Sequence, residues 1–156
     1  MINASVRVVY RAAHWGLRAL WFVSRPETNG ALVAVWHNGR VLVVKNSYRR
    51  QLTLPGGYVR PREDRRNTAA RELQEEVGII VQPSSLVHAY HGTHLFEHRK
   101  DTLDIYELEL DHEPTIEVDD REVVLAAFHT PDELLSMTVV PHLEEYLTQR
   151  ISRGTA

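Results

Sequence analysis

Two apolar runs lie close together early in the chain, at residues 31–36 (Ala-Leu-Val-Ala-Val-Trp) and 41–44 (Val-Leu-Val-Val). Runs of this length and composition are typical of buried β-strands. Asn38 and Gly39 stand between them, and an Asn-Gly pair in such a place is the strongest short signal for a tight hairpin turn. The pattern therefore predicts a β-hairpin over residues 31–44.

Further strands are predicted downstream, where short apolar or alternating runs end in turn residues. Pro55, Gly56 and Gly57 end the first of them in a flexible turn, where the backbone can approach a ligand closely. The predicted strands cover residues 52–54, 85–96, 102–110 and 122–129, with a turn around 98–101.

Helical spacing appears between these strands and after them. Ala70, Leu73 and Val77 stand at i, i+3 and i+7, which gives a helix one apolar face. This helix is expected to begin near Asn67 or Thr68 and to end at Gly78. A short helix is predicted after Pro131, and a longer one after Pro141. Strands before, between and after helices indicate a mixed α/β fold.

Residues 6–23 form a long, mostly apolar stretch. Basic residues and a histidine interrupt it: Arg7, Arg11, His14 and Arg18. Its longest unbroken apolar run, residues 19–23, is too short to span a bilayer, and no small-residue cleavage site follows it. The stretch permits an amphipathic helix on a membrane surface, but we favour a helix or strand packed on the domain or on a second subunit, as in a homodimer. We therefore assign residues 1–29 to an N-terminal extension and 30–156 to the main domain.

The composition is that of one ordinary globular domain, with 156 residues, of which 43% are hydrophobic and 25% charged. A net charge of -3 gives no general field that attracts nucleic acid, so we expect no DNA partner, and an anionic ligand must be held by a local cluster or a metal. The absence of cysteine excludes disulfides, thiolate catalysis and sulfur-based zinc sites. It is compatible with a reducing cytoplasm, which is the predicted location.

Acidic residues gather between the glycine turn and the end of the first predicted helix of the main domain. Glu72, Glu75 and Glu76 stand at i, i+3 and i+4, so a helix presents all three on one face. Like charges stacked in this way suggest that a cation lies between them. The three glutamates alone would more often be a solvated helix face, but the residues around them point elsewhere.

The stretch from 57 to 79 resembles the signature of the Nudix hydrolase family, which includes the MutT-like nucleoside diphosphate-X hydrolases. That signature reads Gly-x5-Glu-x7-Arg-Glu-U-x-Glu-Glu-x-Gly-U, where U is aliphatic. Every fixed position is matched here: Gly57, Glu63, Arg71, Glu72, Leu73, Glu75, Glu76, Gly78 and Ile79. The resemblance implies a Nudix-like α/β/α sandwich with a mixed β-sheet between helices, over about residues 30–150. It also implies hydrolysis of nucleoside diphosphates linked to another group, usually with Mg²⁺ or Mn²⁺.

Hard divalent cations prefer carboxylate and carbonyl oxygens, which agrees with what the resemblance implies. We assign Glu72, Glu75, Glu76 and the backbone carbonyl of Gly57 as ligands for Mg²⁺ (or Mn²⁺), with Glu72 and Glu76 as the most secure pair. Bound ions would neutralise a diphosphate and lower the pKa of a water that attacks phosphorus.

Two further roles come from the family pattern. It suggests that Arg71 pairs with Glu63 and fixes the loop against the helix, as a planar guanidinium can. Residues 120–134 are similar to a frequent late segment of the family, and there Glu122 is a candidate for general base or for an extra metal ligand. An exposed carboxylate at the start of a strand is an equal alternative for Glu122. The predicted catalytic residues are Glu63, Arg71, Glu75, Glu76 and Glu122.

Some positions depart from frequent family residues without touching the signature. They are Leu52 and Phe128 in place of tryptophan, Arg62 in place of glycine, and Leu125 in place of an acidic residue. These departures weaken any transfer of substrate identity from well-known subfamilies.

Basic and aromatic residues near the glycine turn are candidates for binding the substrate. Arg49, Arg50 and Arg60 can donate charge-assisted hydrogen bonds to phosphate oxygens, and Tyr58 can stack on a base. Each of these residues could equally belong to a solvated loop or to the core. A histidine cluster follows: His88, His91, His94 and His98. In a regular strand His88 and His94 share one face while His91 lies on the other, so we expect polar strand positions or substrate contacts rather than a zinc site.

The sequence thus predicts a divalent-metal-dependent pyrophosphohydrolase that cleaves the diphosphate linkage of a nucleotide or nucleoside diphosphate conjugate. The substrate class stays open between a nucleoside triphosphate, a nucleoside diphosphate sugar and a dinucleotide. The alternative is a nucleotide-sensing or RNA-associated module with the same fold and no turnover.

Overall fold

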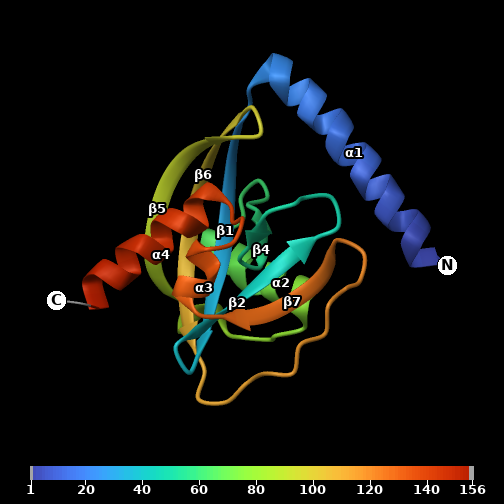
Figure 1. Cartoon of the computed structure of the whole chain (residues 1–156). Helices are drawn as coiled ribbons and strands as arrows, with labels where there is room; N and C mark the ends of the chain where they lie inside the picture. Colours follow the sequence, from blue (N-terminus) through green and yellow to red (C-terminus); the bar gives the residue numbers. More distant parts are fainter. Residues whose placement is uncertain (1, 155–156) are drawn as a thin grey trace.

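The computed structural model describes residues 2–154. In this part of the chain, seven strands form one mixed sheet with helices on both faces (Figure 1). The predicted α/β/α sandwich is therefore confirmed. The elements in chain order are α1 (Ile2–Ser24), β1 (Glu27–His37), β2 (Arg40–Asn46), β3 (Leu52–Thr53), β4 (Gly56–Tyr58), α2 (Arg65–Val77), η1 (Pro83–Ser85), β5 (Val87–Phe96), β6 (Arg99–Glu109), β7 (Val123–His129), α3 (Pro131–Leu135) and α4 (Pro141–Gly154).

The central strand β1 explains why its sequence is apolar without interruption. It runs parallel to β6 over ten residue pairs. Its odd-numbered residues, such as Val33, pack with α2 on one face of the sheet. Its even-numbered residues, such as Trp36, pack with α3 and α4 on the other face. Because both faces are covered, every residue from 31 to 37 is buried.

The predicted hairpin between β1 and β2 is confirmed at its turn. Asn38 (φ 49°) and Gly39 (φ 71°) both have positive φ, as the favoured two-residue hairpin turn requires. The ladder contains only the pairs Trp36–Val41 and His37–Arg40. Further along, β1 pairs with β4 and β2 pairs with β7. The two strands therefore separate and become parts of different regions of the sheet.

Helix α2 ends where the sequence predicts but begins earlier. Gly78 has φ 74° and caps the C-terminus, donating its N–H to the carbonyl of Gln74. The predicted start at Asn67 or Thr68 is wrong, because Asp64 is the N-cap. Its carboxylate accepts the N–H groups of Arg66 at 2.9 Å and of Asn67 at 3.2 Å, so the helix already begins at Arg65.

The hairpin of β5 and β6 is tighter than predicted. The turn expected at residues 98–101 consists of Glu97 and His98, both with positive φ, and β6 begins at Arg99. The first strand begins at Val87 rather than at residue 85, because Pro83–Ser85 form a short 3₁₀ turn. Polar residues in a left-handed conformation conceal this turn from a search based on glycine and proline.

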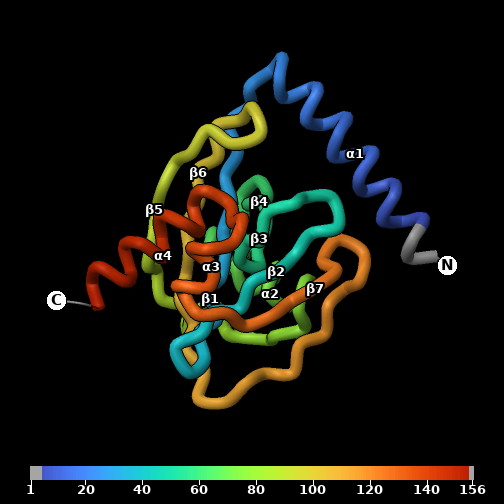
Figure 2. Tube along the Cα trace, in the orientation of Figure 1, coloured from blue at the N-terminus to red at the C-terminus, as the bar shows by residue number. Residues whose placement is uncertain are grey.

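The N-terminal stretch forms one long helix, α1. Figure 2 shows it running along one side of the molecule, and its C-terminal end lies beside the β5–β6 turn, where Phe22 contacts the His98 ring edge-on at 5.1 Å. Within the residues that the structure describes, no helix combines the length and apolar character needed to cross a membrane.

Candidate active site

The glycine turn of β4 brings the backbone directly against the carboxylates of α2. The N–H of Gly56 donates to Oε2 of Glu76 at 2.8 Å. A Cβ added to Gly57 would lie 2.5 Å from the carboxyl carbon of Glu72. Only glycine permits this approach, so the turn and the helix face form one unit.

Glu72 and Glu76 line a cavity of about 280 Å³, the candidate catalytic cavity. Glu76 is only 7% exposed, and burial raises its pKa well above the ordinary value, with nearby Glu122 and Glu72 adding to the effect. Burial also raises the pKa of Glu72, although Arg71 opposes this. The cavity thus holds two carboxylates whose negative charge is poorly compensated by the protein.

Arg71 links the loop before α2 to the helix. Its Nε and Nη2 donate to the two carboxylate oxygens of Glu63 at 2.8 and 3.0 Å, a bidentate pair. This hydrogen bonding lowers the pKa of Glu63 to about 2. Nη1 of Arg71 also donates to Glu72 at 2.5 Å, so Arg71 holds a cavity carboxylate in position.

Glu75 is turned away from this cavity. Its Oε2 lies 3.1 Å from Arg71, its Oε1 lies 3.9 Å from Arg60, and its side chain is 52% exposed. The helical turn explains this, because residues i+3 and i+4 point in directions about 100° apart. No group of three His, Asp or Glu side chains among the described residues is arranged to hold a metal ion. Glu72 and Glu76 are the two predicted ligands from α2 that face the cavity.

Glu122 contributes a third carboxylate to the cavity wall. It lies just before β7, and its Oε1 accepts the hydroxyl of Tyr48 at 2.6 Å. Its carbonyl accepts the N–H of Ser47 at 2.7 Å. These bonds tie the segment before β7 to the end of β2, so a residue 46 positions beyond Glu76 faces the same space.

The sequence did not identify several buried polar groups in this cavity. They are Arg99, Asn46 and His142, all at most 5% exposed. Among residues 2–154, no hydrogen-bond partner is found for Nε of Arg99, Oδ1 of Asn46 or Nε2 of His142, nor for Nε of Arg49. Buried polar groups are normally paired, so this wall is suited to a polar ligand. No local signal marks these residues, because separate elements bring them together.

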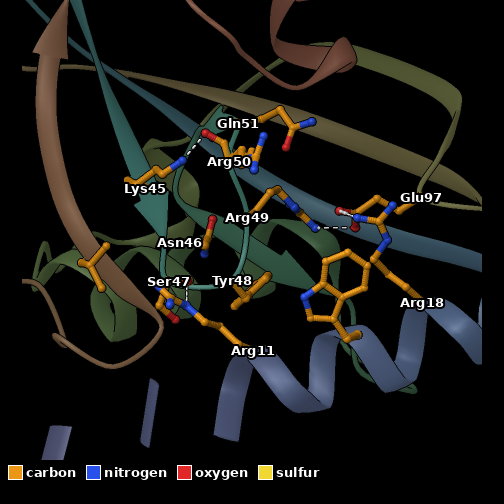
Figure 3. Close-up of a pocket in the computed structure, with 12 residues that line it drawn as sticks. Arg11, Arg18, Lys45, Asn46, Ser47, Tyr48, Arg49, Arg50, Gln51 and Glu97 are labelled. Atoms are coloured by element: carbon orange, nitrogen blue, oxygen red, sulfur yellow. Dashed lines mark hydrogen bonds and ion pairs between the residues drawn. The ribbon is translucent and has the colours of Figure 1, made fainter. Parts of the chain in front are cut away.

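A second, basic cavity of about 530 Å³ adjoins the first and shares Asn46, Tyr48 and Arg49 with it. Figure 3 shows Arg11 of α1 reaching to Ser47 in the loop after β2, and Arg18 of α1 lying beside Glu97. Of the predicted substrate-binding residues, Arg49 lines both cavities, Arg50 lines the basic one, and Tyr58 and Arg60 line the catalytic one. The basic cavity's cations are Arg11, Arg18, Lys45, Arg49 and Arg50, against the single carboxylate of Glu97.

The predicted alternation of the histidines is wrong. The pairing of β5 with β6 shifts register between His88 and Tyr90, and such a bulge reverses the side-chain alternation. His88 and His91 therefore both contact Oδ1 of Asp104, at 2.8 and 2.9 Å. His94 instead contacts Glu145 at 2.9 Å. The histidines lie outside the residues that line the catalytic cavity.

The carboxylates, the glycine turn and the arginine clamp identify the family. The family model described as the NUDIX domain matches residues 26–149. The chain belongs to the Nudix family. It is a Nudix hydrolase, an enzyme class that acts on phosphorus anhydrides. Helix α1 precedes the matched residues, so its contribution to the site lies outside the matched NUDIX domain.

Solved structures agree on the fold. The MutT protein of Methanosarcina mazei Go1 has a TM-score of 0.71 and 18% identity, over 85% of this chain and 98% of its own. An Ap4A hydrolase of C. elegans scores 0.66 at 16% identity, over 83% and 97%. The E. coli dihydroneopterin triphosphate pyrophosphohydrolase scores 0.67 at 20% identity, over 78% and 92%. No protein of curated function matches the chain in sequence. Enzymes named for different substrates are thus about equally similar, and the fold does not select among them.

The cavity fits a hard divalent cation on chemical grounds. Carboxylate oxygens of Glu72 and Glu76 and the backbone of the glycine turn are the donor types that Mg²⁺ and Mn²⁺ prefer. Burial raises the pKa of Glu76, and the nearby Glu122 and Glu72 add to this, so a bound cation would stabilise the charged form of Glu76.

Proposed function

We propose that the chain is a divalent-metal-dependent pyrophosphohydrolase that cleaves the diphosphate linkage of a nucleotide or nucleoside diphosphate conjugate. The observation that carries this proposal is the joint presence of Glu72, Glu76 and Glu122 with Arg49 and Arg99 around one cavity. Carboxylates suited to a cation and arginines suited to phosphate rarely share a small cavity unless a metal-bound phosphate lies between them.

The arginines support binding of the diphosphate. Arg49 and Arg99 are anchored by acidic residues, Arg49 to Glu97 at 3.1 Å and Arg99 to Asp101 at 3.0 Å. Each keeps its Nε without a protein partner. A guanidinium anchored on one side can donate to a phosphate oxygen with little loss of side-chain entropy.

The reaction adds water across the P–O–P bridge. The water oxygen bonds to one phosphorus, the bridging oxygen leaves with the other phosphate, and a base takes up the proton of the water. A divalent ion held by Glu72, Glu76 and the Gly57 carbonyl would supply charge neutralisation and a more acidic water. Arg71 and Glu63 keep Glu72 in place.

Glu122 is our candidate for the base. Its carboxylate lies on the same cavity wall and is oriented by the Tyr48 hydroxyl. The exposed Glu75 is assigned a supporting role at the rim, where a carboxylate could bind a further hydrated ion beside Arg71.

The proposal is tested with a panel of nucleoside triphosphates, nucleoside diphosphate sugars and dinucleoside polyphosphates, assayed with Mg²⁺ and Mn²⁺. Phosphate released by added inorganic pyrophosphatase would identify pyrophosphate and hence a triphosphate substrate. Phosphate released by added phosphatase from a conjugate, with none released by pyrophosphatase, would identify a conjugate substrate. Glu76→Gln is expected to lower turnover about 10²- to 10³-fold. Glu144→Gln, on the exposed side of α4, is the matched control and should leave turnover unchanged.

Two results would contradict the proposal. One is turnover in Glu76→Gln equal to that of Glu144→Gln. The other is tight nucleotide binding with no product from any member of the panel, which would favour the alternative of a sensing module.

We also infer that α1 mediates a homodimer. Its outer face is apolar and exposed: Val8, Val9, Leu20 and Val23. The arginines of α1 turn towards the domain, Arg7 to Asp120, Arg11 to the Ser47 carbonyl and Arg18 to Glu97. Since these cations are engaged, the outer face lacks the basic rim that suits a lipid surface and better fits a second protein helix.

Sedimentation velocity tests this inference. Leu20→Glu should shift a dimer to monomer, whereas Leu95→Glu, at an even more exposed apolar position on β5, should not. A monomeric wild-type protein at high concentration would contradict it. The negative net charge supports the expectation that the protein does not bind DNA. The lack of cysteine supports a reducing compartment such as the cytoplasm.

A further inference from the structure

Helix α1 presents aromatic and polar side chains to the catalytic domain rather than its largest apolar ones. Tyr10, His14, Leu17 and Trp21 follow one another at intervals of three and four residues, so they lie on one face of the helix. His14 is buried, and its ring lies 4.7 Å from that of Tyr48. The matched NUDIX domain begins after this helix, so the residues that α1 contributes to these contacts lie outside the matched residues.

This face of α1 encloses a cavity of about 250 Å³ against the domain. Its wall contains Tyr10, Ala13, His14, Leu17 and Trp21 from α1 and Tyr48, Arg49, Tyr58 and Glu122 from the domain. All four domain residues also line the catalytic cavity. The two cavities therefore share a wall, and a molecule bound to the carboxylates can extend towards α1.

The rings around this cavity are arranged to accept a flat group. Tyr10 and Tyr48 are nearly parallel, at 14° with centroids 6.5 Å apart, which is at the long end of the range for direct ring contact. The guanidinium of Arg99 lies between two further rings, 4.5 Å from Trp21 and 5.2 Å from Tyr58. Arg99, which lines the neighbouring catalytic cavity, thus holds Trp21 of α1 beside that cavity.

We propose that α1 and the domain together form a binding site for a nucleobase of the substrate, and we call it the α1 cage. The inference rests on the proposed function for the position of the phosphates, but it concerns a separate cavity. Three features support it: the aromatic wall, the shared boundary with the catalytic cavity, and the polar groups of His14, Arg49 and Glu122 at its edge. A planar base with hydrogen-bonding edges uses all three, because its faces stack on the rings while its edges meet the polar groups.

The test compares ligands that differ only in the base. Calorimetry with Mg²⁺ measures binding of AMP, GMP, CMP and UMP against ribose 5-phosphate, which carries the same phosphate without a base. The wild-type chain should bind at least one of the nucleotides more tightly than ribose 5-phosphate. Trp21→Leu and Tyr10→Leu should each weaken that nucleotide about tenfold, since stacking on an aromatic side chain contributes on this scale, and should leave ribose 5-phosphate unchanged.

Controls separate the cage from effects on folding. Trp21→Phe keeps a ring and should retain most of the affinity. Phe22→Leu removes an exposed ring from the neighbouring position of α1 and should change neither ligand. The α1 cage is overturned if no nucleotide binds more tightly than ribose 5-phosphate, or if Trp21→Leu and Phe22→Leu behave alike. Hydrolysis of the nucleotide panel with an unaltered KM in Trp21→Leu would refute the cage and keep the proposed function. Base-dependent binding without hydrolysis of any nucleotide in the panel would support the α1 cage and contradict the proposed function.

Discussion

The catalytic domain and helix α1 differ in the kind of side chain that each buries. In the domain, large apolar side chains such as Leu42 and Leu73 are fully buried between the sheet and its helices. In α1, Val23 is 81% exposed, and within residues 5–24 the buried side chain is that of His14. The domain buries its apolar residues, whereas α1 turns its polar and aromatic residues inward.

This difference indicates how each part contributes to function. Burial of apolar area dominates folding, so the domain keeps Glu72 and Glu76 in position by its own stability. Helix α1 is positioned by ion pairs and ring contacts, including Arg7 with Asp120 and Arg18 with Glu97. Contacts of this kind contribute less per pair, so α1 can adjust to a ligand while the carboxylate site stays unchanged.

The largest expected effect is on the stability of the domain core. Leu73→Ala removes a fully buried side chain from the inner face of α2 and should lower the free energy of unfolding by about 2–5 kcal/mol. Leu20→Ala, on the outer face of α1, removes the same atoms from a position that is exposed in the single chain, and it should leave the free energy of unfolding nearly unchanged when measured at a concentration low enough to keep the protein monomeric. Urea denaturation measures both. Equal losses in the two variants would mean that α1 is covered as the core is.

A smaller effect concerns pH. Burial lowers the pKa of His142 to about 3, so the folded chain keeps this histidine neutral where the unfolded chain, with its ordinary pKa of 6.5, binds a proton. Acidification below pH 6.5 therefore favours the unfolded state, by up to about 1.4 kcal/mol per pH unit from this residue. The free energy of unfolding of His142→Gln, measured by urea denaturation, should fall less between pH 7.5 and 5.5 than that of the wild type. Parallel losses would show that His142 is protonated in the folded chain.

The smallest expected effect concerns an ion pair that joins α1 to the domain. Arg7→Ala removes a partly exposed ion pair with Asp120 and should change global stability by no more than about 1 kcal/mol. Amide hydrogen exchange should nevertheless become faster in the first turns of α1 and not in β1. Lys100→Ala, which removes the exposed pair with Glu27, is the control and should not affect α1. Unchanged exchange in Arg7→Ala would mean that the other contacts of α1 hold its first turns without this ion pair.

Most of the domain's elements could be predicted from the sequence because their signals are local. The Asn38-Gly39 turn and the Gly78 cap depend on backbone conformations that few residues adopt easily. The apolar stripe of α2 and the apolar run of β1 follow from the periods of helix and strand. The missed boundaries, at Asp64 and at the Glu97–His98 turn, depend on which of several polar residues makes the cap or turn.

The candidate site was predictable only in part. The signature identified Gly57, Glu72 and Glu76 around one turn, because they lie within twenty residues of one another. The outward direction of Glu75 and the bulge beside His88 were not predictable, since each depends on the particular geometry of a single element. Arg99 and His142 belong to β6 and α4, and no spacing along the chain relates them to the carboxylates.

What the sequence determined by itself is the set of local conformations and the chemistry of one helix face, because short-range sterics and hydrogen bonding act between near neighbours in the chain. The tertiary structure alone decided which distant groups share the cavity and which face of α1 meets the domain. The sequence of α1 has both an apolar and a basic, aromatic face, and either could have been buried. The acidic residues Glu97 and Asp120, brought beside the helix by other elements, select the basic one.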